Sequence, residues 1–209
     1  MSLKDAKISF VVDIAAHLFM QKSIKEVTIK DIAVEAGVGE ATIYRYFTNK
    51  ENIVLACVMM LQQEVNKHYF KLNKGNSGYE KIEIFFNSYL DVFKANPDYF
   101  YFIREFDAFM YNQNPDILKS YEKEIDKYHT DFIEAYELGL KDGSINKLED
   151  VNVFYYSTTH SILELCKKLS IHQALLAQDK VTQKVAEIKC LINIILKSLK
   201  SCESNASKN

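Results

Sequence analysis

The side chains best suited to contacting another macromolecule are concentrated in residues 28–50, TIKDIAVEAGVGEATIYRYFTNK. This segment predicts two short helices separated by a tight turn at Gly37. Thr28 and Asp31 have the spacing of a capping-box variant that begins the first helix, and Gly39 is an acceptable N-cap for the second. Helices this short are unstable alone, so we expect an apolar seam to hold them together and against a preceding helix.

The second short helix, Glu40 to Tyr46, carries several polar side chains on the face opposite that seam. A helix inserted in the major groove of DNA presents such side chains to base edges and phosphates. The Thr42 hydroxyl and methyl suit a base or thymine, and the Arg45 guanidinium suits guanine. We therefore expect DNA contacts from Thr28, Lys30, Gly39, Glu40, Ala41, Thr42, Tyr44, Arg45, Tyr46 and Lys50.

Three of these side chains have an alternative role. Tyr44 can pack partly inward, and Arg45 can simply face solvent or an acidic neighbour. Glu40 brings negative charge near DNA, so it either turns outward or accepts a hydrogen bond from a cytosine amino group.

This segment resembles the helix-turn-helix of the TetR family of bacterial regulators. The family pattern G-V-x-x-x-T-x-Y-x-Y-F followed by x-x-K is matched by Gly37-Val38, Thr42, Tyr44, Tyr46-Phe47 and Lys50, and T-x-x-x-I-A is matched by Thr28, Ile32 and Ala33. The resemblance covers roughly residues 6–60. Beyond them only the number and lengths of the expected helices are similar.

The resemblance implies a transcription regulator, most often a repressor that releases its operator when a small molecule binds the helical body. It places Thr42 and Tyr44 at the groove and makes Thr28, Tyr46 and Lys50 phosphate contacts. Gly39 departs from the family, because many members have a serine there that caps the helix and touches DNA. An activator of the same family and a helical small-molecule carrier without DNA binding are the alternatives.

Composition favours an all-α fold, because the chain has only 2 prolines and 6 glycines and its hydrophobic share of 48% can fill a sizeable core. We expect about nine helices. The expected domains are a three-helix DNA-binding domain at residues 1–50, with its helix-turn-helix at about 28–47, a ligand-binding and dimerisation domain at 51–200, and a polar tail at 201–209. The net charge of −2 neither supports nor excludes DNA binding, since a small basic footprint can lie on an acidic body.

Helical periodicity supports this division of the chain. The expected ranges are an amphipathic helix around 8–19, a long helix from Asn49 to about 65, and helices at 79–94, after Asn96-Pro97, after Asn114-Pro115 as far as 140, at about 151–176 and at 181–199. Residues 74–78 form the clearest linker.

The second half of the chain is rich in aromatic residues, most of which must be core. Bulky rings between helices can also enclose an apolar pocket. The candidate lining residues are Tyr89, Phe93, Phe106, Phe109, Tyr128, Phe132 and His160, and a small apolar or aromatic effector is expected. Glu105, Asp107 and Glu164 either face such a pocket, which would favour a cationic ligand, or lie on solvated helix faces.

The last helix carries apolar residues over a broad arc, which needs a second packing partner. We expect Ile188, Leu191, Ile192, Ile195 and Leu199 at the interface of a homodimer. In the TetR family the final two helices pair with their two-fold mates, and the two helix-turn-helix motifs would then meet palindromic operator half-sites roughly 34–36 Å apart.

Other classes of function lack support in the sequence. Cys57, Cys166, Cys190 and Cys202 are scattered without a disulfide or zinc pattern, and the five histidines lack metal-ligand spacing. No nucleophile-plus-base spacing or phosphate-binding glycine loop is present, so we expect neither an enzyme nor a cofactor. The apolar runs are too short for a membrane span, and we expect a cytoplasmic protein.

Overall fold

A computed structural model describes residues 2–111, 113, 115–171 and 183–201 of the chain. The fold is all-α, and the described residues form nine α-helices and two short 3-10 turns. The chain divides into two compact units: Met1–Val65 with Asp98–Ile125, here the first unit, and Asn66–Pro97 with Asp126–Asn209, here the second unit. No helix in the described ranges has the length and apolar character needed to cross a bilayer.

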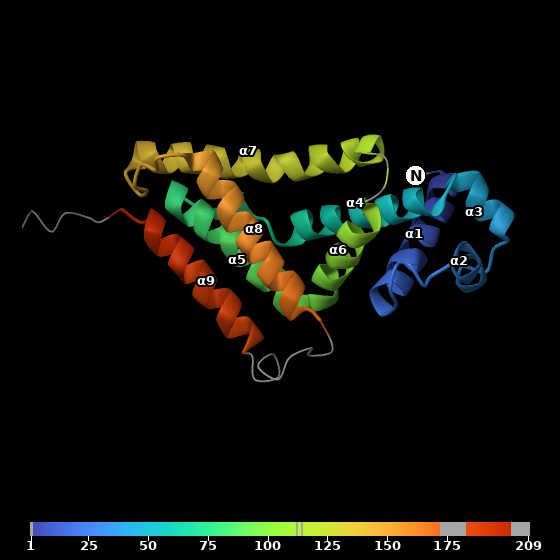
Figure 1. The fold of residues 1–209 in the computed structure, drawn as a ribbon. Coiled ribbons are helices and arrows are strands. Elements are labelled where there is room, and N and C mark those ends of the chain that lie inside the picture. The colour runs from blue at the N-terminus through green and yellow to red at the C-terminus, as the bar shows by residue number, and fades with distance from the viewer. Residues whose placement is uncertain (1, 112, 114, 172–182, 202–209) are drawn as a thin grey trace, which may run out of the picture. The chain divides into compact units, whose positions relative to one another are not determined.

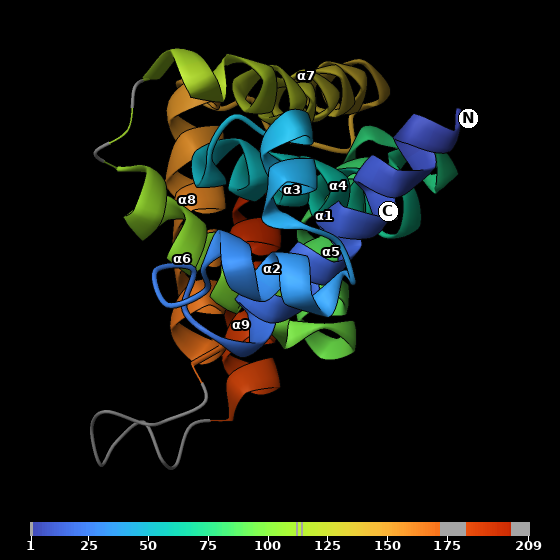
Figure 2. The same ribbon diagram turned by 90° about the vertical axis from the view of Figure 1, so that its right-hand side faces the viewer.

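The first unit begins with α1 (Leu3–Gln21), α2 (Ile29–Glu35) and α3 (Glu40–Tyr46), and continues into α4 (Lys50–His68). These helices are at the blue end of the chain in Figure 1, and Figure 2 looks onto α2 and α3. The first unit also contains α6 (Pro97–Met110) and the 3-10 turn η2 (Pro115–Leu118). The α1 helix buries Val11, Val12, Ala15, Ala16 and Phe19, which confirms the predicted amphipathic helix.

The second unit contains the 3-10 turn η1 (Leu72–Lys74), α5 (Gly78–Ala95), most of α7 (Lys119–Asp142), α8 (Val151–Leu169) and α9 (Lys184–Leu199). Helix α9 packs along α5 and α8 (Figure 1). Asn114, residues 172–176 of the predicted 151–176 helix, residues 181–182 of the last predicted helix and residues 202–209 of the predicted tail lie outside the described residues.

Aromatic rings form much of the core of the second unit. The Phe85 ring lies edge-on to Phe86 and Phe132, with centroids 5.3 and 5.5 Å apart, and tilted at 6.2 Å from Tyr155. Phe85, Phe86 and Phe132 are fully buried. Edge-to-face pairs of this kind add to the stabilisation from buried apolar area, so these rings stabilise the fold of the second unit.

The end of α9 is tied to the connection between α7 and α8. The Asn146 amide donates to the Leu199 carbonyl (2.9 Å), and the Asn146 side chain donates to the Lys200 carbonyl (2.9 Å). The Ser201 amide donates to the Ser144 carbonyl (3.3 Å). A single antiparallel bridge, Ile145 with Lys200, is the strand-like feature of the described residues. Sequence periodicity did not predict it, because a bridge this short has no alternation to detect.

Two glycines allow α5 and α7 to touch. A Cβ atom on Gly78 would fall inside the contact distance of the Gly139 backbone and of the Ala135 carbonyl oxygen. The Gly78 amide also donates to the Asp142 carboxylate (2.8 Å), which holds the start of α5 against the end of α7. The approach therefore requires glycine at residue 78.

We expect Gly78→Ala to lower the free energy of unfolding by about 2 kcal/mol or more, because the clash is with backbone and cannot be relieved by a rotamer change. Urea unfolding followed by circular dichroism measures the loss. Glu83→Ala is the control, since Glu83 is exposed on the same helix α5 and the change adds no atom to the contact with α7. Equal stability of the Gly78→Ala variant and the wild type would contradict this packing.

Candidate nucleic-acid interface

The start of α2 is fixed by a reciprocal capping box. The Asp31 amide donates to the Thr28 hydroxyl oxygen (3.1 Å), while the Thr28 amide (2.8 Å) and hydroxyl (2.7 Å) both donate to the Asp31 carboxylate. Asp31 therefore completes the box in place of the more common glutamate, as the sequence predicted. The hydrogen bonds from the Thr28 hydroxyl and amide lower the pKa of the Asp31 carboxyl.

A tight turn then reverses the chain between α2 and α3. Gly37 has φ +65°, the left-handed conformation that favours glycine. The Gly37 amide donates to the Val34 carbonyl (3.1 Å) and the Val38 amide to the Ala33 carbonyl (2.9 Å), so the last carbonyls of α2 are satisfied. The turn brings α3 into contact with α2.

Helix α3 is held by one apolar face and exposes the other. Ile43 is fully buried, and Phe47, which ends the helix, is 7% exposed. On the other face Glu40, Ala41 and Arg45 are exposed, and Tyr44 keeps 52% of its surface in contact with solvent. Tyr44 therefore does not pack inward, and the outward face is the one predicted to meet DNA.

The remaining candidate residues of the first unit flank α3. Thr28, Lys30 and Gly39 are exposed, while Thr42 and Tyr46 are half-buried. The Arg45 guanidinium lies over the Tyr46 ring, 5.3 Å from its centroid, so Arg45 has a stacking partner as well as solvent. No hydrogen bond or ion pair holds the Glu40 carboxylate among the described residues.

Lys50 is half-buried at the start of α4. Its ammonium donates to the Lys25 carbonyl (3.4 Å) and lies 5.4 Å from the centroid of the Phe109 ring. Desolvation lowers the pKa of Lys50, opposed by the nearby charges of Glu51 and Asp31. The Phe109 ring was predicted to line a ligand pocket. Its place beside Lys50 was not foreseen, because the two residues are far apart in sequence.

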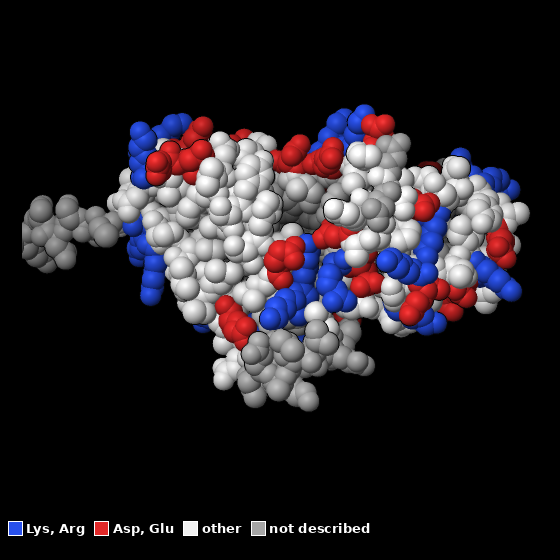
Figure 3. All heavy atoms as spheres, in the orientation of Figure 1, with Lys and Arg blue, Asp and Glu red and all other residues white. Residues whose placement is uncertain are grey.

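Charge is mixed over these helices. On the face shown in Figure 3, blue and red side chains alternate over α1 to α4, without a continuous basic stripe. Positive and negative side chains are therefore mixed on these helices, as they are in the chain as a whole, whose net charge is −2. Affinity for a polyanion would then depend on a few well-placed cations rather than on a general field.

The predicted pocket residues are divided between the two units. Phe106 and Phe109 belong to the first unit, and the other five belong to the second. Tyr89 and Tyr128 surround the Phe70 ring, with centroids at 5.4 and 4.6 Å, and Phe93 and Phe132 are buried. His160 is exposed on α8 and does not line the interior of its unit, which corrects that prediction. The register of α8 buries Thr159 and Ile162 and turns His160 outward.

A cavity of about 340 Å³ opens in the second unit beside Phe70. It is lined by Phe70, Leu72, Asn73, Lys81, Asp131, Glu134 and Ala135, none of which was predicted as a pocket residue. Burial, followed by the charge of Glu134, raises the pKa of the Asp131 carboxyl. The cavity therefore combines an apolar wall with a charged rim.

The acidic side chains considered for the pocket, Glu105, Asp107 and Glu164, lie in different settings. Glu105 accepts hydrogen bonds from Ser23 and Arg104, and Glu164 pairs with Lys167 at 2.7 Å. Asp107 is exposed. No group of three His, Cys, Asp or Glu side chains within the described ranges is arranged to hold a metal ion.

The predicted dimer residues require a correction. Ile188, Ile192, Ile195 and Leu199 are buried within the unit itself, and only Leu191 is partly exposed. The broad apolar arc of α9 is covered by α5 and α8 of the same chain. The apolar side chains that remain on the surface of α8 and α9 are Val153, Tyr156, Val185 and Ile194.

The capping box makes a prediction about pH. Because the pKa of Asp31 is lower in the folded protein than in the unfolded chain, its stabilising effect is complete above the unfolded pKa of about 3.9 and is lost as the pH falls through the folded pKa. Asp31→Asn should therefore cost stability at neutral pH, and the cost should shrink in acid. Urea unfolding of both proteins from neutral to acidic pH measures this. A difference that does not vary with pH would contradict it.

Comparison with solved structures gives the same fold. The chain is similar to the regulator FadR from Bacillus subtilis, solved in complex with stearoyl-CoA (TM-score 0.72, 16% identity, covering 91% of this chain and 98% of that one). It is also similar to the ketosteroid regulator KstR2 of Mycobacterium tuberculosis (TM-score 0.66, 13% identity, 93% and 95% covered). A TetR-family regulator from Agrobacterium tumefaciens matches with TM-score 0.73 at 12% identity, with 94% and 99% covered. At these identities the likeness is one of fold.

Comparison of sequences locates the family resemblance. No curated protein matches the chain significantly. Residues 11–57 match the family model of bacterial regulatory proteins of the tetR family, and this range includes α2, the Gly37 turn and α3. Residues 11–57 of this all-α chain are therefore a helix-turn-helix domain of the TetR type.

Proposed function

We propose that this chain binds operator DNA as a homodimer and acts as a repressor that releases the operator when a small molecule binds. The observation that carries the proposal is the exposed face of α3. Buried Ile43 and Phe47 fix the helix, and Glu40, Tyr44 and Arg45 project from it. A rigidly anchored short helix with exposed polar side chains is what the major groove accepts.

The proposed contacts divide into two kinds. Glu40, Ala41, Thr42 and Arg45 would read base edges, since they lie on or beside the outward face of α3. Thr28, Lys30, Tyr44, Tyr46 and Lys50 would contact phosphates and set the register of the helix in the groove. Gly39 offers a backbone amide there, with open space around it.

The dimer would form through α8 and α9. Val153 is 61% exposed on α8 and Ile194 is 61% exposed on α9, with Tyr156 and Val185 nearby in sequence on the same helices. Figure 3 shows an uncharged area where α8 and α9 lie in Figure 1. An exposed apolar surface on two packed helices favours pairing with a second copy, which would supply the two DNA-binding helices that a palindromic operator needs.

The effector would be a small apolar or aromatic compound bound in the helical body. The aromatic core of the second unit supplies apolar walls, and the similar FadR structure holds stearoyl-CoA. Such a compound lowers operator affinity only by its preference for the conformation that does not bind DNA.

Arg45→Gln should weaken operator binding about tenfold, because it removes a guanidinium that can pair with guanine or a phosphate. Duplexes selected from a randomised pool would be used to measure affinity by fluorescence anisotropy over a KCl series. The matched control is Lys141→Gln, which removes one exposed cation from α7. An equal loss in the two variants, or a wild type that selects no sequence, would overturn the proposal.

The complex of the wild-type protein with its selected DNA duplex can also be used to test whether a small molecule releases the DNA. Stearoyl-CoA, free fatty acids and steroids would be titrated onto the operator complex, in parallel with thermal unfolding of the protein alone. A true effector raises both the thermal midpoint and the dissociation constant for DNA. A compound that raises the midpoint and leaves DNA affinity unchanged would argue against release by a ligand.

Ile194→Glu should convert the dimer to a monomer and weaken operator binding at least about tenfold, because a charge in the apolar contact has no partner. Sedimentation velocity gives the oligomeric state. Leu3→Glu is the control, since Leu3 is 76% exposed on α1. A dimeric Ile194→Glu variant would place the interface elsewhere.

A further inference from the structure

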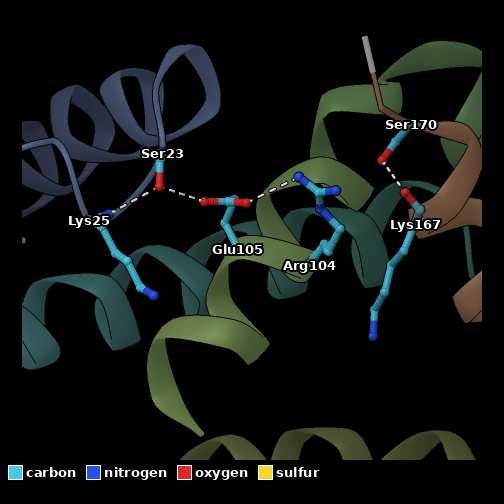
Figure 4. Close-up of polar contacts among 6 residues, drawn as sticks. All are labelled: Ser23, Lys25, Arg104, Glu105, Lys167 and Ser170. Carbon is cyan, nitrogen blue, oxygen red and sulfur yellow. Dashed lines mark hydrogen bonds and ion pairs between the residues drawn. The ribbon is translucent and has the colours of Figure 1, made fainter. Parts of the chain in front are cut away.

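A chain of contacts in the first unit begins and ends on α6. The Ser23 hydroxyl donates to the Glu105 carboxylate (2.7 Å), and the Lys25 amide donates to the Ser23 hydroxyl oxygen (3.3 Å), as Figure 4 shows. The Lys25 carbonyl accepts from the Lys50 ammonium (3.4 Å), which lies over Phe109, 5.4 Å from the ring centroid. Glu105 and Phe109 are one helical turn apart, so they share a face of α6.

We propose that Glu105 and Phe109 are positioning residues for DNA binding, which hold the Lys25 backbone and the Lys50 side chain where Lys50 meets a DNA phosphate. This rests on the proposed DNA-binding function. Neither residue would touch DNA. Glu105 would act through Ser23 on the connection between α1 and α2, and Phe109 would act directly on the Lys50 ammonium.

Glu105 is a firm anchor for that connection. Its side chain is only 18% exposed, and its second carboxylate oxygen accepts from the Arg104 guanidinium (3.2 Å). Arg104 is itself placed over the Tyr101 ring, 5.1 Å from the centroid. Because the Ser23 hydrogen bond is made to a charged and partly buried acceptor, it is stronger than a neutral one.

Packing fixes α6 to the same part of the first unit. The Phe102 ring, one turn before Glu105 and Phe106, stacks on Phe19 of α1, with centroids 6.4 Å apart. Both rings are fully buried. The face of α6 that carries Phe102, Glu105 and Phe109 therefore contacts α1, the connection after it and the start of α4, in that order along the helix.

Restricting the Lys50 side chain favours its contact with a phosphate. A lysine side chain is long and flexible, so a phosphate contact normally costs much rotamer freedom. The hydrogen bond to Lys25 and the Phe109 ring use only part of the ammonium's capacity for three donors, and the residue is only half-buried. A side chain already restricted in this way binds a phosphate at a lower entropic cost.

A double-mutant cycle tests the proposal. The probe is a mixed-sequence DNA duplex long enough for both half-sites, because phosphate contacts do not depend on sequence. Phe109→Leu, which keeps an apolar side chain and removes the ring, should weaken binding about two- to fivefold. Ser23→Ala should weaken it in the same direction. On a Lys50→Gln background both substitutions should cause no further loss.

Two controls separate positioning from a general structural effect. Phe109→Tyr keeps the ring face and should retain wild-type affinity, whereas Tyr111→Leu makes a comparable change at a residue that is 86% exposed and should have no effect. Lys50→Gln should lower the slope of log affinity against log salt by about 1.

Losses that add to that of Lys50→Gln, or the absence of a loss in Phe109→Leu and Ser23→Ala, would overturn the inference while the DNA-binding function stands. A wild type that binds no duplex at low salt would overturn both.

Discussion

The proposed DNA-binding surface depends on the contacts that hold the seven-residue helix α3 in place. Helix α3 is too short to be stable alone, so its geometry comes from contacts outside it. Ile43 and Phe47 supply the buried contacts, the Gly37 turn sets the crossing with α2, and the Thr28–Asp31 capping box fixes where α2 begins. Every side chain offered to a ligand by α3 is aimed by these constraints, none of which needs to touch the ligand.

The same dependence extends into α6. The contacts that hold the short helix α3 are local in sequence, but Lys50 and Ser23 are held by Phe109 and Glu105, which lie far along the chain. The first unit is therefore assembled from two separate stretches of sequence. Lys50, the residue at the start of α4 that we propose contacts DNA, shares one set of contacts with α6, so a shift of α6 would move the Lys50 ammonium.

Local features were predictable from the sequence because they depend on neighbouring residues. Capping at Thr28, the positive φ of Gly37 and the buried stripe of α1 are all encoded within a few positions. The outward face of α3 was predictable for the same reason. Residues 28–50 therefore form the two short helices and the Gly37 turn that the sequence predicted.

Features that depend on partners distant in sequence were not predictable. Periodicity counted the apolar residues of α9 correctly, yet it could not say that α5 and α8 of the same chain cover Ile188, Ile192 and Ile195. His160 was grouped with aromatic core residues by composition, whereas the register of α8 turns it outward. The cavity beside Phe70 arises where η1, α5 and α7 meet, and no single segment carries a signal for it.

The hydrogen bonds between residues 144–146 and the end of α9 restrict how this helix can move. Three hydrogen bonds fasten Leu199, Lys200 and Ser201 to the turn after α7, so α9 cannot slide along its own axis without breaking them. Any adjustment of α9 is then a swing about this pinned end, which moves its opposite end furthest. A displacement at the start of α9 would therefore appear as a change in the angle of the whole helix rather than as a shift along its axis.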